Sequence, residues 1–147
     1  MTEPLPPTIQ HIMLCACYLA AKHNPESLDM NNRQHRLGVG TVIEQTAAGQ
    51  LLIGSTREFV GFDHQTTLVG AEAVAKHACE LFPGLASVNI IRTFSGLRPK
   101  TEDGLPILGP VESLPGLIMA TGHEGDGIAL APITGKLIAD YVDEMNV

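Results

Sequence analysis

The chain has 147 residues, enough for one domain that buries a core, and its composition of 44% apolar and 17% charged residues excludes a disordered chain. Its formal net charge is −7 and its lysines and arginines form no cluster, which argues against a nucleic-acid-binding surface because phosphate contacts need clustered basic side chains. No apolar run reaches the roughly 18 residues that would cross a bilayer, so no membrane span is expected.

The N-terminal part combines a proline-rich lead-in, residues 1–8, with one apolar element at residues 9–22. The apolar residues of this element have helical spacing, but so short an apolar run is equally compatible with a buried strand, and both interpretations stay open. Asn24-Pro25 would end the element, because the residue before a proline avoids the helical conformation. The polar residues 24–37 are expected to form a loop.

A β-hairpin is expected next. Residues 38–45 and 50–56 are rich in β-forming side chains, and they flank a short connection that ends in Gly49. A connection of four or five residues containing glycine is typical of an antiparallel hairpin. Further β-like runs lie at residues 86–94, 105–108 and 117–120.

Two helices are expected, one before and one after these three further β-like runs. The first covers residues 67–82, with Thr66 or Thr67 as its N-cap and Pro83 as its stop signal. The second begins near Ile128 and has a predicted buried stripe made of Leu130, Ile133, Leu137, Ile138, Tyr141 and Val142. Pro132 lies near its start, where only the first turn or a kink accommodates a proline. The elements predict an α+β fold with an antiparallel sheet and packed helices.

The cysteines are Cys15, Cys17 and Cys79, and only one residue separates the first two. This spacing differs from the two-residue gap of common redox and zinc motifs. An odd number of cysteines without an export signal favours reduced thiols and a cytoplasmic location. The histidines form no metal-ligand pattern either, so no metal site is predicted.

A glycine-rich turn at residues 122–127 separates a predicted strand from the last helix. Free backbone N–H groups and the positive end of a helix dipole meet at such a turn, which suits an anion or a partly negative oxygen. The plainer alternative is a connection whose glycines only permit tight geometry. The glycine spacing differs from the dinucleotide-binding pattern, so no pyrophosphate site is expected here.

Arg98 follows an apolar run and precedes a proline. Its guanidinium offers a rigid fork of donors for a carboxylate, whereas the alternative is an ion pair with Glu102 or Asp103. His123, in the glycine-rich turn, could be a general base near neutral pH, although a histidine in a turn is more often a hydrogen-bonding spacer. No serine, cysteine or aspartate is spaced to complete a catalytic triad with it.

Several ordered motifs together resemble the C-terminal part of FAD-dependent oxidoreductases of the D-amino-acid oxidase superfamily. This family includes glycine oxidase, the β subunit of sarcosine oxidase, hydrogen cyanide synthase and D-amino-acid dehydrogenases. The resemblance covers about residues 38–145. The motifs that carry it lie at residues 54–63, 82–85, 95–99, 102–109 and 121–128.

The resemblance implies roles for individual residues. The arginine of the Gly-Leu-Arg-Pro motif binds the substrate carboxylate in the family, which gives that role to Arg98. Arg57 would face the substrate pocket and add a second contact to an acidic substrate. The positions implied to lie by the flavin are Gly96, Leu97, Gly122, His123, Glu124, Gly125, Asp126, Gly127 and Ile128. The N–H groups of residues 125–128 would stabilise negative charge on the reduced flavin.

The implied reaction is hydride transfer from the α-carbon of a small amine or amino acid to FAD, followed by hydrolysis of the imine. The implied organisation has three segments. Residues 1–37 begin the substrate domain, residues 38–110 form the substrate-binding portion, and residues 111–147 are a strand, loop and helix that return to the FAD-binding domain.

The chain also departs from the family pattern. Glycine oxidase has a second arginine in the loop after its Gly-His pair, and this position is Gly125 here, so the carboxylate would be bound differently. The substrate-facing tyrosine of the family has no counterpart, because Thr41 and Val42 occupy that strand. Relatives also make the region of residues 9–22 extended.

The largest departure is the lack of the Rossmann-type half, whose crossover unit needs roughly 30 residues, before the matched region. The chain is therefore expected to be a split subunit, the product of a truncated reading frame or an engineered fragment of a longer protein. It would hold FAD only with a chain or domain that supplies the nucleotide-binding half, and an electron-acceptor subunit and self-association are further expected partners. The alternative is a non-catalytic remnant or assembly subunit that keeps the fold and binds protein.

Overall fold

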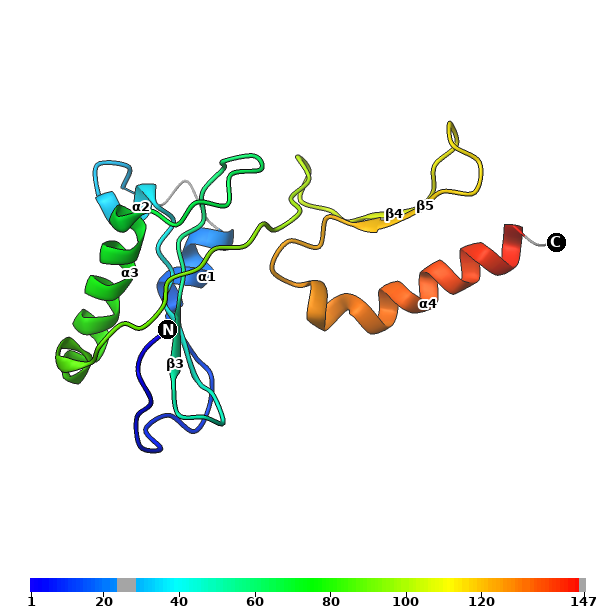
Figure 1. Ribbon diagram of the computed structural model, residues 1–147. Helices are drawn as coiled ribbons and strands as arrows, with labels where there is room; N and C mark the ends of the chain where they lie inside the picture. Colours follow the sequence, from blue (N-terminus) through cyan, green and yellow to red (C-terminus); the bar gives the residue numbers. More distant parts are fainter. Residues whose placement is uncertain (24–28, 146–147) are drawn as a thin grey trace. The chain divides into compact units, whose positions relative to one another are not determined.

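The computed structural model describes residues 1–23 and 29–145, and Figure 1 shows its ribbon. The chain divides into two compact units, Met1–Ser95 and Gly96–Val147, and each is described by itself. Both units contain antiparallel strands and at least one helix, so the predicted α+β class is confirmed. The observed division falls after Ser95, whereas the sequence predicted a boundary after residue 110. The predicted boundary refers to the complete fold of the family, and it stays a prediction.

The N-terminal unit is built on a small antiparallel sheet with the order β1 (Met13–Leu14), β2 (Val42–Gln45) and β3 (Leu51–Gly54). In β2 and β3, Ile43 pairs with Ile53, and the Thr46 N–H donates to the Gln50 carbonyl at 2.9 Å across the turn. The predicted hairpin is thus confirmed. Its turn closes tightly because Gly49 has a φ of 91°, which favours glycine.

The lead-in is part of this unit. Thr2 bridges to Ile90, and its side chain is 4% exposed. Glu3 accepts hydrogen bonds from the backbone N–H and the side-chain amide of Asn89 at 2.9 and 3.0 Å. These bonds, the backbone bond first, lower the pKa of the Glu3 carboxyl from its ordinary value. The start of the chain is therefore held against residues 89 and 90, which are far from it in sequence.

The element at residues 9–22, left open between helix and strand, contains both. A two-residue strand, β1, is followed by helix α1 (Ala16–His23), and the Cys15 N–H continues the sheet contact by donating to the Thr41 carbonyl at 2.8 Å. The predicted stop at Asn24-Pro25 lies outside the described residues. The expected loop was wrong for its last part, because a short helix, α2 (Arg33–Arg36), is capped by the Asn32 side chain.

The predicted helix after the hairpin is α3 (Leu68–Leu81), and its N-cap is Thr67, whose side chain accepts from the Gly70 N–H at 3.0 Å. The buried face of α3 includes Ala73 and Ala78, and α3 packs on β3. The buried apolar side chains in the described part of the chain are Val39, Ile43, Leu51, Ala73 and Ala78. All of them belong to the N-terminal unit, which therefore has a core of its own.

Removal of the cap is expected to weaken this unit. The change Thr67→Ala leaves the Gly70 N–H without its acceptor and should lower the free energy of unfolding by about 1 kcal/mol. Urea unfolding followed by circular dichroism measures the change. Thr66→Ala is the matched control, since Thr66 is exposed and precedes the cap, and equal losses in both variants would contradict the assignment.

The prediction of a β-like run at residues 86–94 was wrong. A 3-10 helix, η2 (Pro83–Ser87), covers its beginning, and Ile90 contributes only the isolated bridge to Thr2. The apolar pattern suggested a strand, but within the described residues its backbone partner is the short segment of residues 1–3, which forms a single isolated bridge and not a ladder. A β conformation persists only where its backbone groups find such partners.

The C-terminal unit consists of an antiparallel pair, β4 (Ile107–Pro110) and β5 (Ile118–Thr121), and the long helix α4 (Gly127–Met145). Helix α4 packs on β4, where the ring of Tyr141 lies against Gly109. A Cβ added at Gly109 would come within 3.2 Å of the Tyr141 ring, so glycine permits this close approach. Both strands and the helix were predicted within two residues of their observed starts.

The predicted buried stripe of α4 was wrong for most of its members. Leu130, Ile133, Leu137 and Val142 are exposed, whereas Ile138 and Tyr141 are half-buried. In the described residues of the C-terminal unit, one two-stranded ribbon is available, and it covers one narrow side of the helix. Pro132 is the sixth residue of α4, beyond the first turn, and lacks the N–H that would bond the Ile128 carbonyl. None of the helices in the described part of the chain combines the length and apolar character of a bilayer span.

The expectation of reduced cysteines was wrong for two of them in the structure. Cys15 and Cys17 form a disulfide, with their Cα atoms 5.3 Å apart, while Cys79 is free. The turn at the start of α1 brings the two sulfur atoms together, and the number and spacing of cysteines do not reveal this local geometry.

Candidate functional site

The glycine-rich turn connects β5 to α4 and has an unusual backbone. Gly122 has a φ of 87°, and Glu124, a residue with a side chain, has a φ of 50°. A Cβ added at Gly122 would lie 2.8 Å from Thr101 Cγ2 and 3.3 Å from the Cα of Pro106. The turn is thus pressed against a neighbouring segment and admits only glycine at this position.

Arg98 lies beside this turn. The Glu124 N–H donates to the Pro99 carbonyl at 3.1 Å, and Arg98 Nη1 donates to the Glu124 carbonyl at 3.4 Å. Arg98 is exposed, and within residues 1–23 and 29–145 it forms no ion pair, so the alternative of a pair with Glu102 or Asp103 is not observed. Most of the guanidinium donors remain available to an incoming carboxylate.

The N–H groups of the turn are only partly available. The Gly125 N–H donates to the Glu124 carboxylate at 2.9 Å, and the Asp126 N–H donates to the His123 carbonyl at 2.9 Å. The N–H groups of Gly127 and Ile128 have no acceptor within the described residues, as expected at the start of a helix. Four N–H groups were expected to face an anion. Those of Gly127 and Ile128 are therefore free, whereas those of Gly125 and Asp126 stabilise the turn itself.

His123 fixes the turn to the helix. Its Nε2 shares a hydrogen bond of 2.9 Å with Thr134 Oγ1, on the second turn of α4. This contact agrees with the interpretation of His123 as a hydrogen-bonding spacer. The contributions of Pro99 and Thr134 were not predicted, because a backbone acceptor and a helical threonine carry no sequence signal of their own.

The remaining predicted site residues are placed as follows. Gly96 and Leu97 are exposed and precede Arg98, and a Cβ at Gly96 would meet no atom within 4 Å. Arg57 belongs to the N-terminal unit, where its guanidinium carbon lies 5.2 Å from the centre of the Tyr18 ring. This distance allows a cation–π contact. The structure leaves the roles expected for these residues as predictions.

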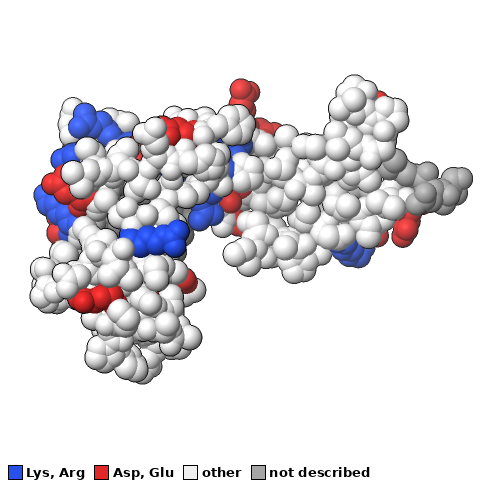
Figure 2. Space-filling model, in the orientation of Figure 1, with Lys and Arg blue, Asp and Glu red and all other residues white. Residues whose placement is uncertain are grey.

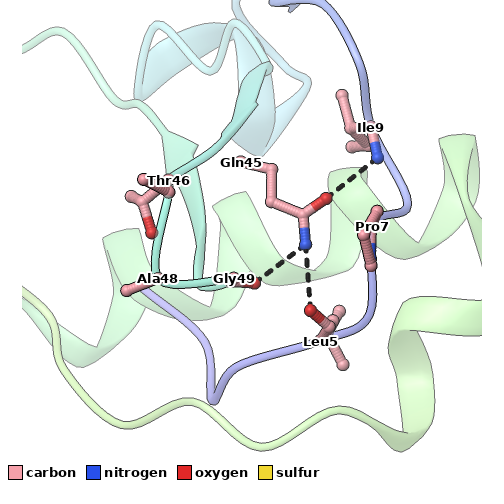
Figure 3. Close-up of a pocket in the computed structure, with 8 residues that line it drawn as sticks. Leu5, Pro7, Ile9, Gln45, Thr46, Ala48 and Gly49 are labelled. Atoms are coloured by element: carbon pink, nitrogen blue, oxygen red, sulfur yellow. Dashed lines mark hydrogen bonds between the residues drawn. The ribbon is translucent and has the colours of Figure 1, made fainter.

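An open hollow of about 410 Å³ lies in the N-terminal unit between the lead-in and the hairpin turn (Figure 3). Gln45 lies at its centre, with its amide oxygen accepting from the N–H groups of Thr8 and Ile9 and its amide nitrogen donating to three carbonyls, including that of Gly49. The protein itself thus uses the polar groups of the hollow. None of the predicted site residues lines it.

On the face drawn in Figure 2, the described residues form no large patch of a single charge. Figure 2 shows acidic and basic side chains interspersed over a mostly uncharged face. The charged side chains of the candidate site are Arg98, Glu124 and Asp126, and the first turn of α4 itself contains no acidic residue.

Comparison with known proteins identifies the family of the chain. Residues 3–141 match the family described as FAD dependent oxidoreductase. The chain belongs to this FAD dependent oxidoreductase family. The expected resemblance is thereby confirmed, and the family description names FAD as its cofactor.

Similar members of the FAD dependent oxidoreductase family include glycine oxidase from Pseudomonas aeruginosa, which is 42% identical over 94 residues and shares 64% of this chain and 26% of its own length. Hydrogen cyanide synthase subunit HcnC from Pseudomonas protegens is 44% identical over 96 residues, 65% of this chain and 23% of its own. The crystal structure of glycine oxidase from Geobacillus kaustophilus matches with a TM-score of 0.64 and 38% identity over 71% of this chain and 28% of that one. The chain spans about a quarter of the length of these relatives.

Proposed function

We propose that the chain is part of an FAD-dependent oxidoreductase that oxidises a small amine or amino acid. In this proposal the chain binds the substrate and one edge of the flavin ring. The observation that carries the proposal is the contact of Arg98 with the turn that opens α4. The contact supports the proposal because it joins a guanidinium, which suits a carboxylate, to the turn that precedes the unused N–H groups of Gly127 and Ile128. Substrates named for relatives, such as glycine for glycine oxidase, set the chemical class that we propose.

The residues present fit one edge of a flavin but not its nucleotide. The N–H groups of Gly127 and Ile128 are unused, and the close packing of Gly122 on Thr101 fixes the turn that precedes them. The sequence holds no G-x-G-x-x-G pattern for a pyrophosphate. We therefore propose that a separate FAD-binding chain or domain contributes the rest of the cofactor site.

Each group of this chain has a defined task in the proposed reaction. Arg98 binds the substrate carboxylate and orients the α-carbon, with Arg57 as a proposed second contact. The first turn of α4 stabilises developing negative charge through the N–H groups of Gly127 and Ile128. When bound, FAD supplies hydride acceptance from the α-carbon, and water hydrolyses the imine product.

The exposed side of α4 supports the need for a further chain or domain. The side chain of Ile128 is 96% exposed and that of Ile133 is 51% exposed, and no apolar side chain of the C-terminal unit is buried within the described residues. A helix normally buries its apolar stripe. We propose that residues 111–147 pack on the FAD-binding half, and that residues 38–110 form the substrate-binding portion with residues 1–37 at its start.

Reconstitution tests the proposal. The chain is coexpressed with a candidate FAD-binding half, and the purified complex is mixed anaerobically with glycine, sarcosine or D-amino acids. We expect a yellow complex whose flavin absorbance is bleached by at least one of these substrates. A complex that binds FAD but stays oxidised with every amine tested would favour the alternative of a non-catalytic assembly subunit, and a lack of any complex would contradict the proposal.

A further inference from the structure

Two elements of the N-terminal unit bring sulfur and imidazole groups together. Cys15 and Cys17 lie at the start of α1, and His77 lies on α3. One ligand atom from each residue lies within 4.8 Å of the other two, and all three residues are half-buried. Cys17 Sγ is 3.9 Å from His77 Nε2.

We propose that, with Cys15 and Cys17 reduced, this cluster is a binding site for a thiolate-preferring metal ion of the Zn²⁺ type. Two thiolates and one imidazole suit zinc and copper(I) rather than magnesium or calcium. Three protein ligands leave a fourth position open to water. The site lies wholly in the N-terminal unit and does not depend on the proposed oxidoreductase function.

The distances fit such an ion. Zinc binds sulfur at about 2.3 Å and imidazole nitrogen at about 2.0 Å, so sulfur and nitrogen ligands of one tetrahedral ion lie about 3.5 Å apart. The observed 3.9 Å between Cys17 Sγ and His77 Nε2 is close to that value. The Cα atoms of Cys15 and Cys17 are 5.3 Å apart, so after reduction other side-chain rotamers place the two sulfurs farther from each other.

Thr41 forms hydrogen bonds with both His77 and Cys15. Its hydroxyl oxygen lies 2.6 Å from His77 Nδ1, and its backbone carbonyl accepts from the Cys15 N–H at 2.8 Å. Thr41 itself is 2% exposed, so its position is fixed by burial. Metal-binding histidines commonly direct their second ring nitrogen to such an oxygen, which fixes the tautomer and leaves the other nitrogen for the metal. This contact turns His77 Nε2 towards the cysteines.

The disulfide and the metal compete for the same sulfurs. Reduction by dithiothreitol breaks the Cys15–Cys17 bond and delivers two electrons and two protons, while the reagent becomes a cyclic disulfide. Metal binding then displaces a proton from each thiol, since the thiolate is the ligand. The oxidised chain therefore lacks the two thiolate ligands.

Titration of the full chain with Co²⁺ and then Zn²⁺ tests the inference. In the reduced protein we expect one Co²⁺ per chain, with sulfur-to-metal charge-transfer absorption that Zn²⁺ abolishes. The oxidised, unmutated chain should show no such absorption. Cys15→Ser and Cys17→Ser should each weaken binding by about 100-fold or more, and Thr41→Val should weaken it about 10- to 100-fold.

Cys79→Ser is the matched control and should leave binding unchanged, because Cys79 is outside the cluster. His77→Gln keeps a polar side chain and should shift the Co²⁺ spectrum as well as the affinity. Circular dichroism of each variant separates loss of ligands from loss of fold. Absence of one-to-one binding in the reduced chain, or equal binding before and after oxidation, would overturn the proposal.

Discussion

In the reconstituted complex, Arg98→Ala should reduce kcat/KM for an amino-acid substrate by about 10- to 150-fold, since a hydrogen-bonded charged group contributes about 1.5–3 kcal/mol. The observed contact of Arg98 with the Glu124 carbonyl is long, at 3.4 Å, so its loss should affect substrate binding more than folding. Steady-state kinetics with an amino acid and with the corresponding amine that lacks the carboxylate give the measurement. Only the amino acid should lose rate.

Arg98→Lys refines this result, because lysine keeps the charge but loses the planar fork. We expect a loss of kcat/KM smaller than that of Arg98→Ala. Arg36→Lys is the matched control, since Arg36 is an exposed arginine on α2 and has no predicted role. Equal kinetics of Arg98→Ala and the unchanged complex would remove Arg98 from the substrate site.

Gly122→Ala should open the turn before α4. A Cβ there would meet Thr101 Cγ2 at 2.8 Å and the backbone of Pro106 and Ile107 at 3.3 and 3.4 Å. The positive φ costs about 1–2 kcal/mol and the overlap a further 1–3 kcal/mol. We therefore expect amide hydrogen exchange in β4 and β5 to accelerate by about 30-fold or more, because each 1.4 kcal/mol corresponds to a factor of about 10.

Gly116→Ala is the matched control for this change. Gly116 has a similar φ of 88°, but a Cβ added there would meet no atom within 4 Å. The control has the free-energy cost of an alanine at positive φ but no steric overlap. It should therefore accelerate amide hydrogen exchange clearly less than Gly122→Ala does. Equal acceleration in both variants would show that the turn is not pressed against the segment at Thr101.

The parts predicted correctly depend on neighbours in sequence. The hairpin follows from a short glycine-containing connection, and α3 follows from an alanine-rich run with Thr67 before it. The candidate site was partly predictable as well. Arg98 and the turn at Gly122 were singled out because a guanidinium after an apolar run and a glycine-rich start of a helix have recognisable chemistry.

The parts that were wrong depend on contacts between distant residues. Residues 86–94 have a strand-like pattern but pair with residues 1–3 in one isolated bridge only, and within the described residues the apolar side of α4 is left uncovered by its own unit. The disulfide of Cys15 and Cys17 depends on the turn that opens α1. A sequence pattern gives the preference of a segment, but the preference is realised only if another segment provides its hydrogen bonds and covers its apolar side.

The sequence by itself determined the hairpin, the two main helices and the residue types of the candidate site, because turns, caps and helical periodicity act over a few residues. Only the tertiary structure decided that the Arg98 side chain meets the carbonyl of Glu124 and that His77 meets Cys17. These pairs are 26 and 60 residues apart along the chain. No local preference encodes such a meeting, because it follows from the packing of whole elements.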